Sequence, residues 1–162
     1  MPSFSTKTIV LKSIAFYASF LLGGYLLWIK SLPIFLAYSI ILIVTIIGLR
    51  YPVCGSCPYY GKPCPSYGFS YLATIFPKVE GKPFNSKAAM IETALMSLCW
   101  LLPILIMVLS WSDVIDSYSL LEYVLTGIYV ILILGVSIAH VVTGCNKCGI
   151  KDCPMNKLFK CS

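Results

Sequence analysis

Four long apolar runs constrain the fold of this chain more than any other feature of its sequence. They cover approximately residues 9–29, 32–49, 88–111 and 120–142. A helix needs roughly 20 residues, each rising by about 1.5 Å, to cross a hydrocarbon core of about 30 Å. The sequence therefore predicts an all-α integral membrane protein with four transmembrane helices, folded as a single membrane domain over residues 1–162.

The composition makes a lipid bilayer the first expected partner of the chain. Hydrophobic residues make up 59% of it and charged residues 11%, whereas a soluble domain carries about 25% charged residues. The first run is longer than the core of a signal peptide, roughly 7 to 15 residues, and no small-residue cleavage site follows Lys30. We therefore expect the first run to be retained as a membrane helix.

The basic residues fall on one side of the predicted membrane. Eleven of the twelve lie near the start of the first run, between the second and third runs, or after the fourth: Lys7, Lys12, Arg50, Lys62, Lys78, Lys82, Lys87, Lys147, Lys151, Lys157 and Lys160. By the positive-inside rule, both termini and the 50–87 loop are predicted to be cytoplasmic in a multi-pass protein of the cell membrane. Because these residues are scattered, they predict contact with anionic headgroups and no nucleic-acid partner.

Two cysteine clusters, residues 54–64 and 145–161, each follow a pair of apolar runs. Each cluster reads Cys-x-x-Cys, then a spacer that contains Lys, then Cys-Pro, although the spacers have six and four residues. This pattern predicts a parallel internal repeat of two helical hairpins, each followed by a cytoplasmic cysteine cluster. A repeat axis along the membrane normal would bring both clusters to the same cytoplasmic end.

The spacing of the cysteines favours a metal site. A Cys-x-x-Cys turn places two sulfurs so that both can bind one metal, in zinc sites and in iron–sulfur sites alike. Disulfides are not the default in a reducing cytoplasm, so this spacing there favours metal or redox chemistry. The predicted metal ligands are Cys54, Cys57, Cys64, Cys145, Cys148, Cys153 and Cys161.

One hypothesis is an electron-transfer protein whose cytoplasmic iron–sulfur centre exchanges electrons with a quinone or a partner subunit. Each cluster ends in Cys-Pro and in part resembles the bacterial ferredoxin run, although the spacing here differs. Cys145, Cys148, Cys153 and Cys161 could ligate one cubane. The first cluster supplies three thiolates, which leaves a fourth position to a partner, to His140 or open. Because the chain has little soluble mass, we also expect other protein subunits.

Two alternatives stay open. Cys54, Cys57, Cys145 and Cys148 could bind zinc in a closed tetrahedral site, and the protein would then be a non-enzymatic scaffold or assembly protein. Cys54 and Cys57 could instead be the thiol–disulfide pair of a membrane oxidoreductase, although no thioredoxin-like βαβ pattern accompanies them. The sequence leaves open whether the protein is an enzyme.

Two titratable residues of the predicted helices are further candidates. His140, the lone histidine, lies about one turn before the second cluster, where it could cap the helix, bind the metal or contact a quinone. A single histidine excludes a bis-histidine haem within one chain. Glu92 lies within about two turns of the expected start of the third helix, where it could be an interfacial carboxylate or take a proton or quinone role.

Three local expectations concern helix ends and the loop after the first cluster. Pro52 is expected to end the second helix, and Asn85 or Ser86 is expected to cap the third. Residues 66–77 are too short to span a membrane but rich in aromatic residues, which predicts a helix in the interface plane. Four aromatic side chains would then lie near the headgroups: Tyr67, Phe69, Tyr71 and Phe76.

Overall fold

The computed structural model describes residues 5–64, 66–67, 69–81, 84–113, 120–145, 148, 150 and 153. Every regular element within these ranges is helical. The elements are α1 (Thr6–Lys30), α2 (Leu32–Ile43), the π-helix η1 (Val44–Leu49), α3 (Arg50–Cys54), α4 (Phe69–Leu72), the 3-10 helix η2 (Ala73–Ile75), α5 (Ser86–Asp113) and α6 (Leu120–Thr143). The expected all-α class is thus confirmed for the described residues.

Four helical segments are long and apolar enough to cross a membrane. They cover Thr6–Lys30, Leu32–Cys54, Ser86–Ser110 and Leu120–Thr143. Each contains one of the four apolar runs predicted from the sequence, apart from one residue at the end of the third. The chain therefore has the helices of a multi-pass membrane protein, and the exposed apolar side chains along them fit a lipid bilayer.

The second membrane-length segment differs from the prediction at its end. Pro52 does not stop the helix, because α2, η1 and α3 follow one another without a break as far as Cys54. In a regular α-helix the ring of Pro52 would clash with the carbonyl group of Gly48. The π-helical stretch Val44–Leu49 has a wider turn there and relaxes this contact. As a result, Cys54 is the last residue of the helical rod.

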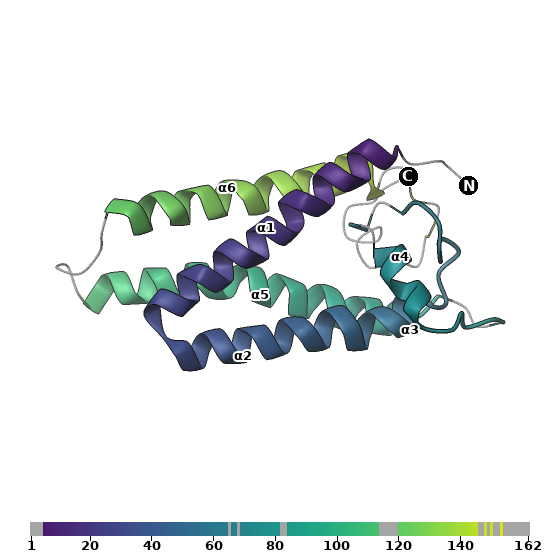
Figure 1. The fold of residues 1–162 in the computed structure, drawn as a ribbon, viewed down its shortest axis with the longest axis horizontal. Helices are drawn as coiled ribbons and strands as arrows, with labels where there is room; N and C mark the ends of the chain where they lie inside the picture. The colour runs from purple at the N-terminus through teal and green to yellow at the C-terminus, as the bar shows by residue number, and fades with distance from the viewer. Residues whose placement is uncertain are drawn as a thin grey trace.

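The helix α1 lies at the centre of the bundle. It crosses diagonally between α6 and α2, and it packs against α6 most extensively and then against α2 and α5 (Figure 1). In the membrane-length window of α1, 44% of the residues are buried, against 11% in the windows of Leu32–Cys54 and α6. The contacts of α1 therefore determine how the other three long helices are arranged.

Two buried tyrosines connect the helices near the middle of the bundle. The Tyr129 hydroxyl donates to the Trp100 carbonyl at 3.0 Å, and the Tyr38 hydroxyl donates to the Phe20 carbonyl at 3.2 Å. Each bond satisfies a tyrosine hydroxyl for which no water is available inside a membrane. The ring of Tyr129 lies directly over Gly23 of α1, where an added Cβ would come within 2.9 Å of the tyrosine oxygen.

Polar contacts also fix two helix ends. The Asn85 side chain accepts a hydrogen bond from the Ala88 N–H at 3.1 Å, which confirms the expected cap of α5. At the other end of the bundle, the ammonium of Lys30 and the carboxylate of Glu122 form an ion pair at 2.8 Å. This pair joins the end of α1 to the start of α6.

The segment after the first cysteine cluster differs in part from its prediction. It does form short helices, α4 and η2. Tyr67 and Phe69, however, are buried in the main hydrophobic core, because α1 offers aromatic rings against which they pack, whereas Tyr71 is 48% exposed. Two of the four aromatic residues expected at headgroup level thus belong to the bundle, and the interfacial position of the segment stays a prediction.

The contact between Gly23 and Tyr129 gives a testable prediction. We expect Gly23→Ala to destabilise the bundle by about 1 to 3 kcal/mol, because the new methyl group overpacks a ring that is fully buried. Gly135→Ala is the matched control, since a Cβ at Gly135 meets nothing within 4 Å. Thermal or denaturant unfolding in detergent, followed by circular dichroism, measures the difference. Equal stability of the two variants would contradict the packing described here.

Candidate metal centre

The two Cys-x-x-Cys motifs form the same local turn at the ends of two membrane-length helices. Cys54 ends α3, and Cys145 follows α6 after one intervening glycine. The Cys57 N–H donates to the Cys54 carbonyl at 3.1 Å, and the Cys148 N–H donates to the Cys145 carbonyl at 3.0 Å. Each turn therefore presents two thiols immediately beyond a helix end.

The fold brings the two cysteine clusters together at one end of the bundle. The Cys57 side chain lies within electrostatic range of the side chains of Cys54, Cys148 and Cys153. Cys64 is likewise within range of Cys54, Cys57 and Cys148. Thiols from both clusters thus lie within electrostatic range of one another, and the described cysteines are not joined in disulfides with one another. The seventh predicted ligand, Cys161, lies outside the described residues.

Burial controls the protonation of the thiols in this group. It raises the pKa of the Cys57 thiol to about 11, against the hydrogen bond from the Tyr59 backbone, and neighbouring thiols raise it further. Burial raises the pKa of the Cys64 thiol to about 12, while the Ser66 N–H, which donates to its sulfur at 3.5 Å, opposes the rise. At neutral pH both groups are protonated, so a bound metal must displace protons from them.

The thiols are gathered without being arranged as ligands of one ion. Among the described residues, no group of three or more His, Cys, Asp or Glu side chains is placed so that it could hold a metal ion. Each cysteine side chain turns about a single bond between Cα and Cβ, so the backbone turns can stay in place while sulfurs move toward a common ion. The donor set, six buried or half-buried thiols, matches a soft metal.

Backbone contacts hold the loop that carries Cys64. The Val79 N–H donates to the Gly55 carbonyl at 3.0 Å, and the Ser70 hydroxyl donates to the Lys62 carbonyl at 2.6 Å. A Cβ at Gly55 would come within 2.7 Å of the Tyr51 carbonyl oxygen, so only glycine allows the chain to turn there so tightly. These bonds fix the loop against the end of α3.

Tyr67 connects the two clusters, a role that its sequence position did not reveal. Its ring stacks on Phe16 at 4.0 Å between centroids and on His140 at 4.9 Å. Its φ of 51° is unusual for a residue other than glycine and is held by this packing. His140 of α6 therefore packs against the segment that follows the first cluster. Its predicted roles as a ligand or quinone contact stay predictions.

Two charged residues are more buried within the bundle than the sequence suggested. Lys12, counted there only as a basic residue of the inner face, is 6% exposed, and its ammonium donates to the Thr143 hydroxyl at 2.9 Å. It is also within electrostatic range of Cys64 and Cys145. Glu92 is 5% exposed, so the bundle encloses a carboxylate that was expected either at the interface or in a proton or quinone role.

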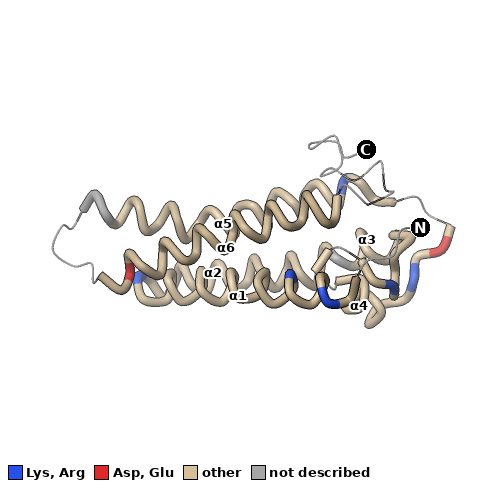
Figure 2. Tube along the Cα trace, turned by 90° about the horizontal axis from the view of Figure 1, so that it is seen from above, with Lys and Arg blue, Asp and Glu red and all other residues tan. Residues whose placement is uncertain are grey.

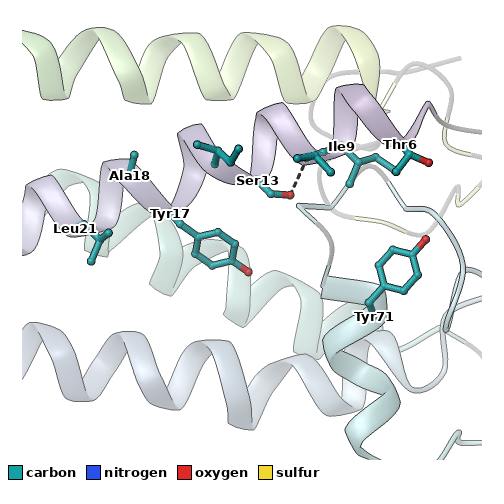
Figure 3. Close-up of a pocket in the computed structure, with 9 residues that line it drawn as sticks. Thr6, Ile9, Ser13, Tyr17, Ala18, Leu21 and Tyr71 are labelled. Atoms are coloured by element: carbon teal, nitrogen blue, oxygen red, sulfur yellow. Dashed lines mark hydrogen bonds between the residues drawn. The ribbon is translucent and has the colours of Figure 1, made fainter.

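An open apolar groove lies along α1 on the side that faces α4. It has a volume of about 490 Å³. Tyr17 of α1 and Tyr71 of α4 both line it (Figure 3). Tyr17 also contacts Phe16, with ring centroids 5.5 Å apart, and Phe16 stacks on Tyr67. A series of ring contacts thus leads from the groove toward the residues around the thiols.

The raised pKa values predict slow alkylation of the metal-free protein. With a pKa of about 11 instead of 9.0, Cys57 has about 100-fold less thiolate at pH 8. We therefore expect iodoacetamide to modify Cys57 about 100-fold more slowly in the chelator-treated protein than in a synthetic peptide of residues 50–68. The rate should rise as the pH approaches 11. Peptide mass spectrometry measures both rates, and equal rates would contradict the burial of this thiol.

Comparison with known proteins gives no match for this chain. No family model matches the sequence, no curated protein matches it, and no solved structure matches the fold. The function must therefore be inferred from the arrangement of the thiols, the buried lysine and the groove.

Proposed function

We propose that the two cysteine clusters form one shared thiolate metal centre in a membrane-anchored electron-transfer protein. The proposed centre is an iron–sulfur cluster that exchanges electrons with a quinone or a partner subunit. One observation carries the proposal: Cys57 of the first cluster is within electrostatic range of Cys148 and Cys153 of the second. Thiols that are 91 residues or more apart in the sequence are therefore neighbours at one end of the bundle.

The buried positions of the helices support an internal repeat of two hairpins. Among the positions of α5 whose exposure is described, the buried ones are Ala89, Glu92, Met96, Cys99, Pro103 and Met107. Each lies 80 residues after a buried residue of α1: Ile9, Lys12, Phe16, Ser19, Gly23 and Leu27. The two helices therefore bury the same face at the same depth, which is what a duplication of the first helix predicts.

The tyrosine hydrogen bonds support the same repeat independently. The two carbonyl acceptors, Phe20 and Trp100, are also 80 residues apart. Tyr38 lies 16 residues before Cys54, and Tyr129 lies 16 residues before Cys145. Both pairs of helices thus combine an equivalent hydrogen bond with an equivalent cysteine turn. A repeat axis along the membrane normal accounts for both thiol clusters lying at one end.

The distribution of charge supports a cytoplasmic position for the centre. Lys and Arg gather at the end of the bundle that carries α3 and α4 (Figure 2). The Lys30–Glu122 ion pair lies at the opposite end, where α1 ends and α6 begins. The positive-inside rule then assigns the thiol end to the cytoplasm of the cell. The reducing conditions there keep thiols available for a metal.

The surroundings of the thiols favour electron transfer over a purely structural site. When bound, an iron–sulfur cluster would accept and release one electron at a time. The thiols would hold it at the membrane surface, with the Ser66 N–H donating to the Cys64 sulfur. The apolar groove beside α1 opens toward lipid and suits the ring and tail of a quinone. Ring contacts through Tyr17 and Phe16 lead from the groove to Tyr67, which follows Cys64 by three residues.

A zinc-stabilised scaffold is the second candidate. It is favoured by the matching turns of Cys54–Cys57 and Cys145–Cys148, because four thiolates from two such turns make a closed tetrahedral site. Zinc would then join the end of α3 to the end of α6. A thiol–disulfide oxidoreductase is less well supported, since a reactive thiol needs a lowered pKa and burial raises the pKa of Cys57.

Metal analysis separates these candidates. We expect the protein, purified anaerobically in detergent, to contain iron and acid-labile sulfide in stoichiometric amounts. Its visible absorption and its EPR signal should change when dithionite is added. Stoichiometric zinc without iron and sulfide would replace the electron-transfer proposal with the scaffold. A protein free of all three would contradict both.

Single substitutions test whether the centre is shared. We expect Cys57→Ser and Cys148→Ser each to remove nearly all bound metal, because in a shared centre each cluster supplies ligands to the same metal and these two thiols lie within electrostatic range of each other. Cys99→Ser is the control, since Cys99 is buried within α5, outside both clusters. Metal content per protein is the measurement. Loss of about half the metal in each variant would indicate two separate sites instead.

A substitution in the groove tests the quinone. Ala18 lines the groove, so Ala18→Trp should fill it and slow electron transfer to a short-chain quinone several-fold, with metal content unchanged. Two molecules of the pre-reduced, desalted protein supply one electron each, and two protons from water complete the conversion of each quinone to quinol. Leu134→Trp is the control, because Leu134 is an exposed residue of α6. Equal rates in the two variants would contradict quinone binding in this groove.

A further inference from the structure

A lysine enclosed by a membrane bundle needs a physical reason. Among the basic residues whose exposure is described, Lys12 alone is buried, at 6% exposed, whereas Lys7 on the same helix is exposed. Transfer of an ammonium group out of water is costly unless hydrogen bonds and negative charge compensate it. A buried cation that is kept in such a place usually has a partner of opposite charge.

Hydrogen bonds hold the Lys12 ammonium at the end of α6. Its Nζ donates to the Thr143 hydroxyl at 2.9 Å. The same hydroxyl donates to the Ala139 carbonyl at 2.6 Å, which fixes its orientation. Thr143 precedes Cys145 by two residues, so this anchor keeps the ammonium close to the second cysteine turn. The position of the charge is therefore set by α6 as well as by α1.

The ammonium lies within electrostatic range of both cysteine clusters, namely of Cys64 from the first and of Cys145 from the second. Four thiolates around one divalent ion carry a net charge of about −2, and so do four thiolates on an oxidised cubane. Reduction adds a further negative charge. A centre of this kind would therefore place negative charge within electrostatic range of the Lys12 ammonium.

We infer that Lys12 is a positioning residue of the shared centre: its ammonium compensates the negative charge of the metal-bound thiolates of both clusters. This inference rests on the proposed function. Since a nearby positive charge favours whichever state is more negative, Lys12 strengthens metal binding and also stabilises the reduced centre relative to the oxidised one. Lys12 thereby links α1 to the chemistry of both halves of the chain.

The test replaces the charge and keeps the volume. We expect Lys12→Met to weaken metal binding by about 10- to 100-fold, measured by competition with a chelator. It should also lower the reduction potential of the centre, measured by a redox titration of the full chain in detergent. Lys12→Arg should recover most of both effects because it restores the positive charge. Lys7→Met, at an exposed position of the same helix, should change neither quantity.

The outcomes separate this inference from the function on which it rests. A wild-type protein without metal overturns the proposed function and the inference together. A wild-type protein with metal, alongside a Lys12→Met variant of unchanged affinity and potential, overturns the inference alone. A structural role, such as counter-charge to the buried Glu92, would instead lower the stability of the metal-free variant and leave the potential unchanged.

Two further cases are covered by the same design. If the centre proves to be zinc, the chelator competition alone decides, with the same expected loss of affinity. If Lys12→Met fails to fold, Thr143→Val takes its place, because it keeps the ammonium and removes the anchor. We expect Thr143→Val to shift affinity, and potential where the metal is redox-active, in the same direction by a smaller amount. No shift in that variant would overturn the inference.

Discussion

The packing of α1 against α6 decides where the two cysteine clusters lie. Near the middle of the bundle the ring of Tyr129 packs over Gly23, and its hydroxyl donates to the Trp100 carbonyl. Nearer the thiols, Lys12 bonds to Thr143. Each α1 contact reaches across from the first half of the chain to the second. Without them each cysteine cluster would be tied only to its own pair of helices, and a shared centre would have no structural basis.

Burial gives the thiol end its chemical character. An exposed thiol near its ordinary pKa reacts readily through its thiolate, but burial keeps Cys57 and Cys64 protonated at neutral pH. A metal reverses this, because binding to sulfur displaces the proton and replaces an expensive free anion with a coordinated one. The same environment therefore suppresses uncontrolled oxidation of Cys57 and Cys64, and any metal that binds there must first displace their protons.

The sequence predicted those features that depend on short stretches of chain. Apolar run length is enough to place a membrane helix, and Asn85 could be recognised as a cap because its hydrogen bond closes within three residues. Pro52 was misjudged because the π-helix before it depends on its surroundings in the bundle. The burial of Tyr67 was not predicted, because its partners, Phe16 and His140, are distant from it in sequence.

The candidate site likewise combines features that short stretches of sequence predict with features that depend on distant residues. The doubled cysteine pattern predicted two clusters with a common orientation, and the local turns follow from the Cys-x-x-Cys spacing. The approach of Cys57 to within electrostatic range of Cys148 required the packing of the whole bundle, as did the burial of Lys12. A lysine inside an apolar run could have signalled the latter, since a membrane helix seldom carries a charge that it does not use.

The proposed repeat explains how a buried lysine could arise without unfolding the metal-free chain. Lys12 and Glu92 occupy equivalent positions of α1 and α5, 80 residues apart, and both are buried. In two helices related by the repeat axis and packed against each other, equivalent positions lie at the same depth. Opposite charges in the same part of a bundle lower the cost of burying either one. The proposed duplication would thus permit a cation near the thiols, and the proposed metal centre would give that cation a function.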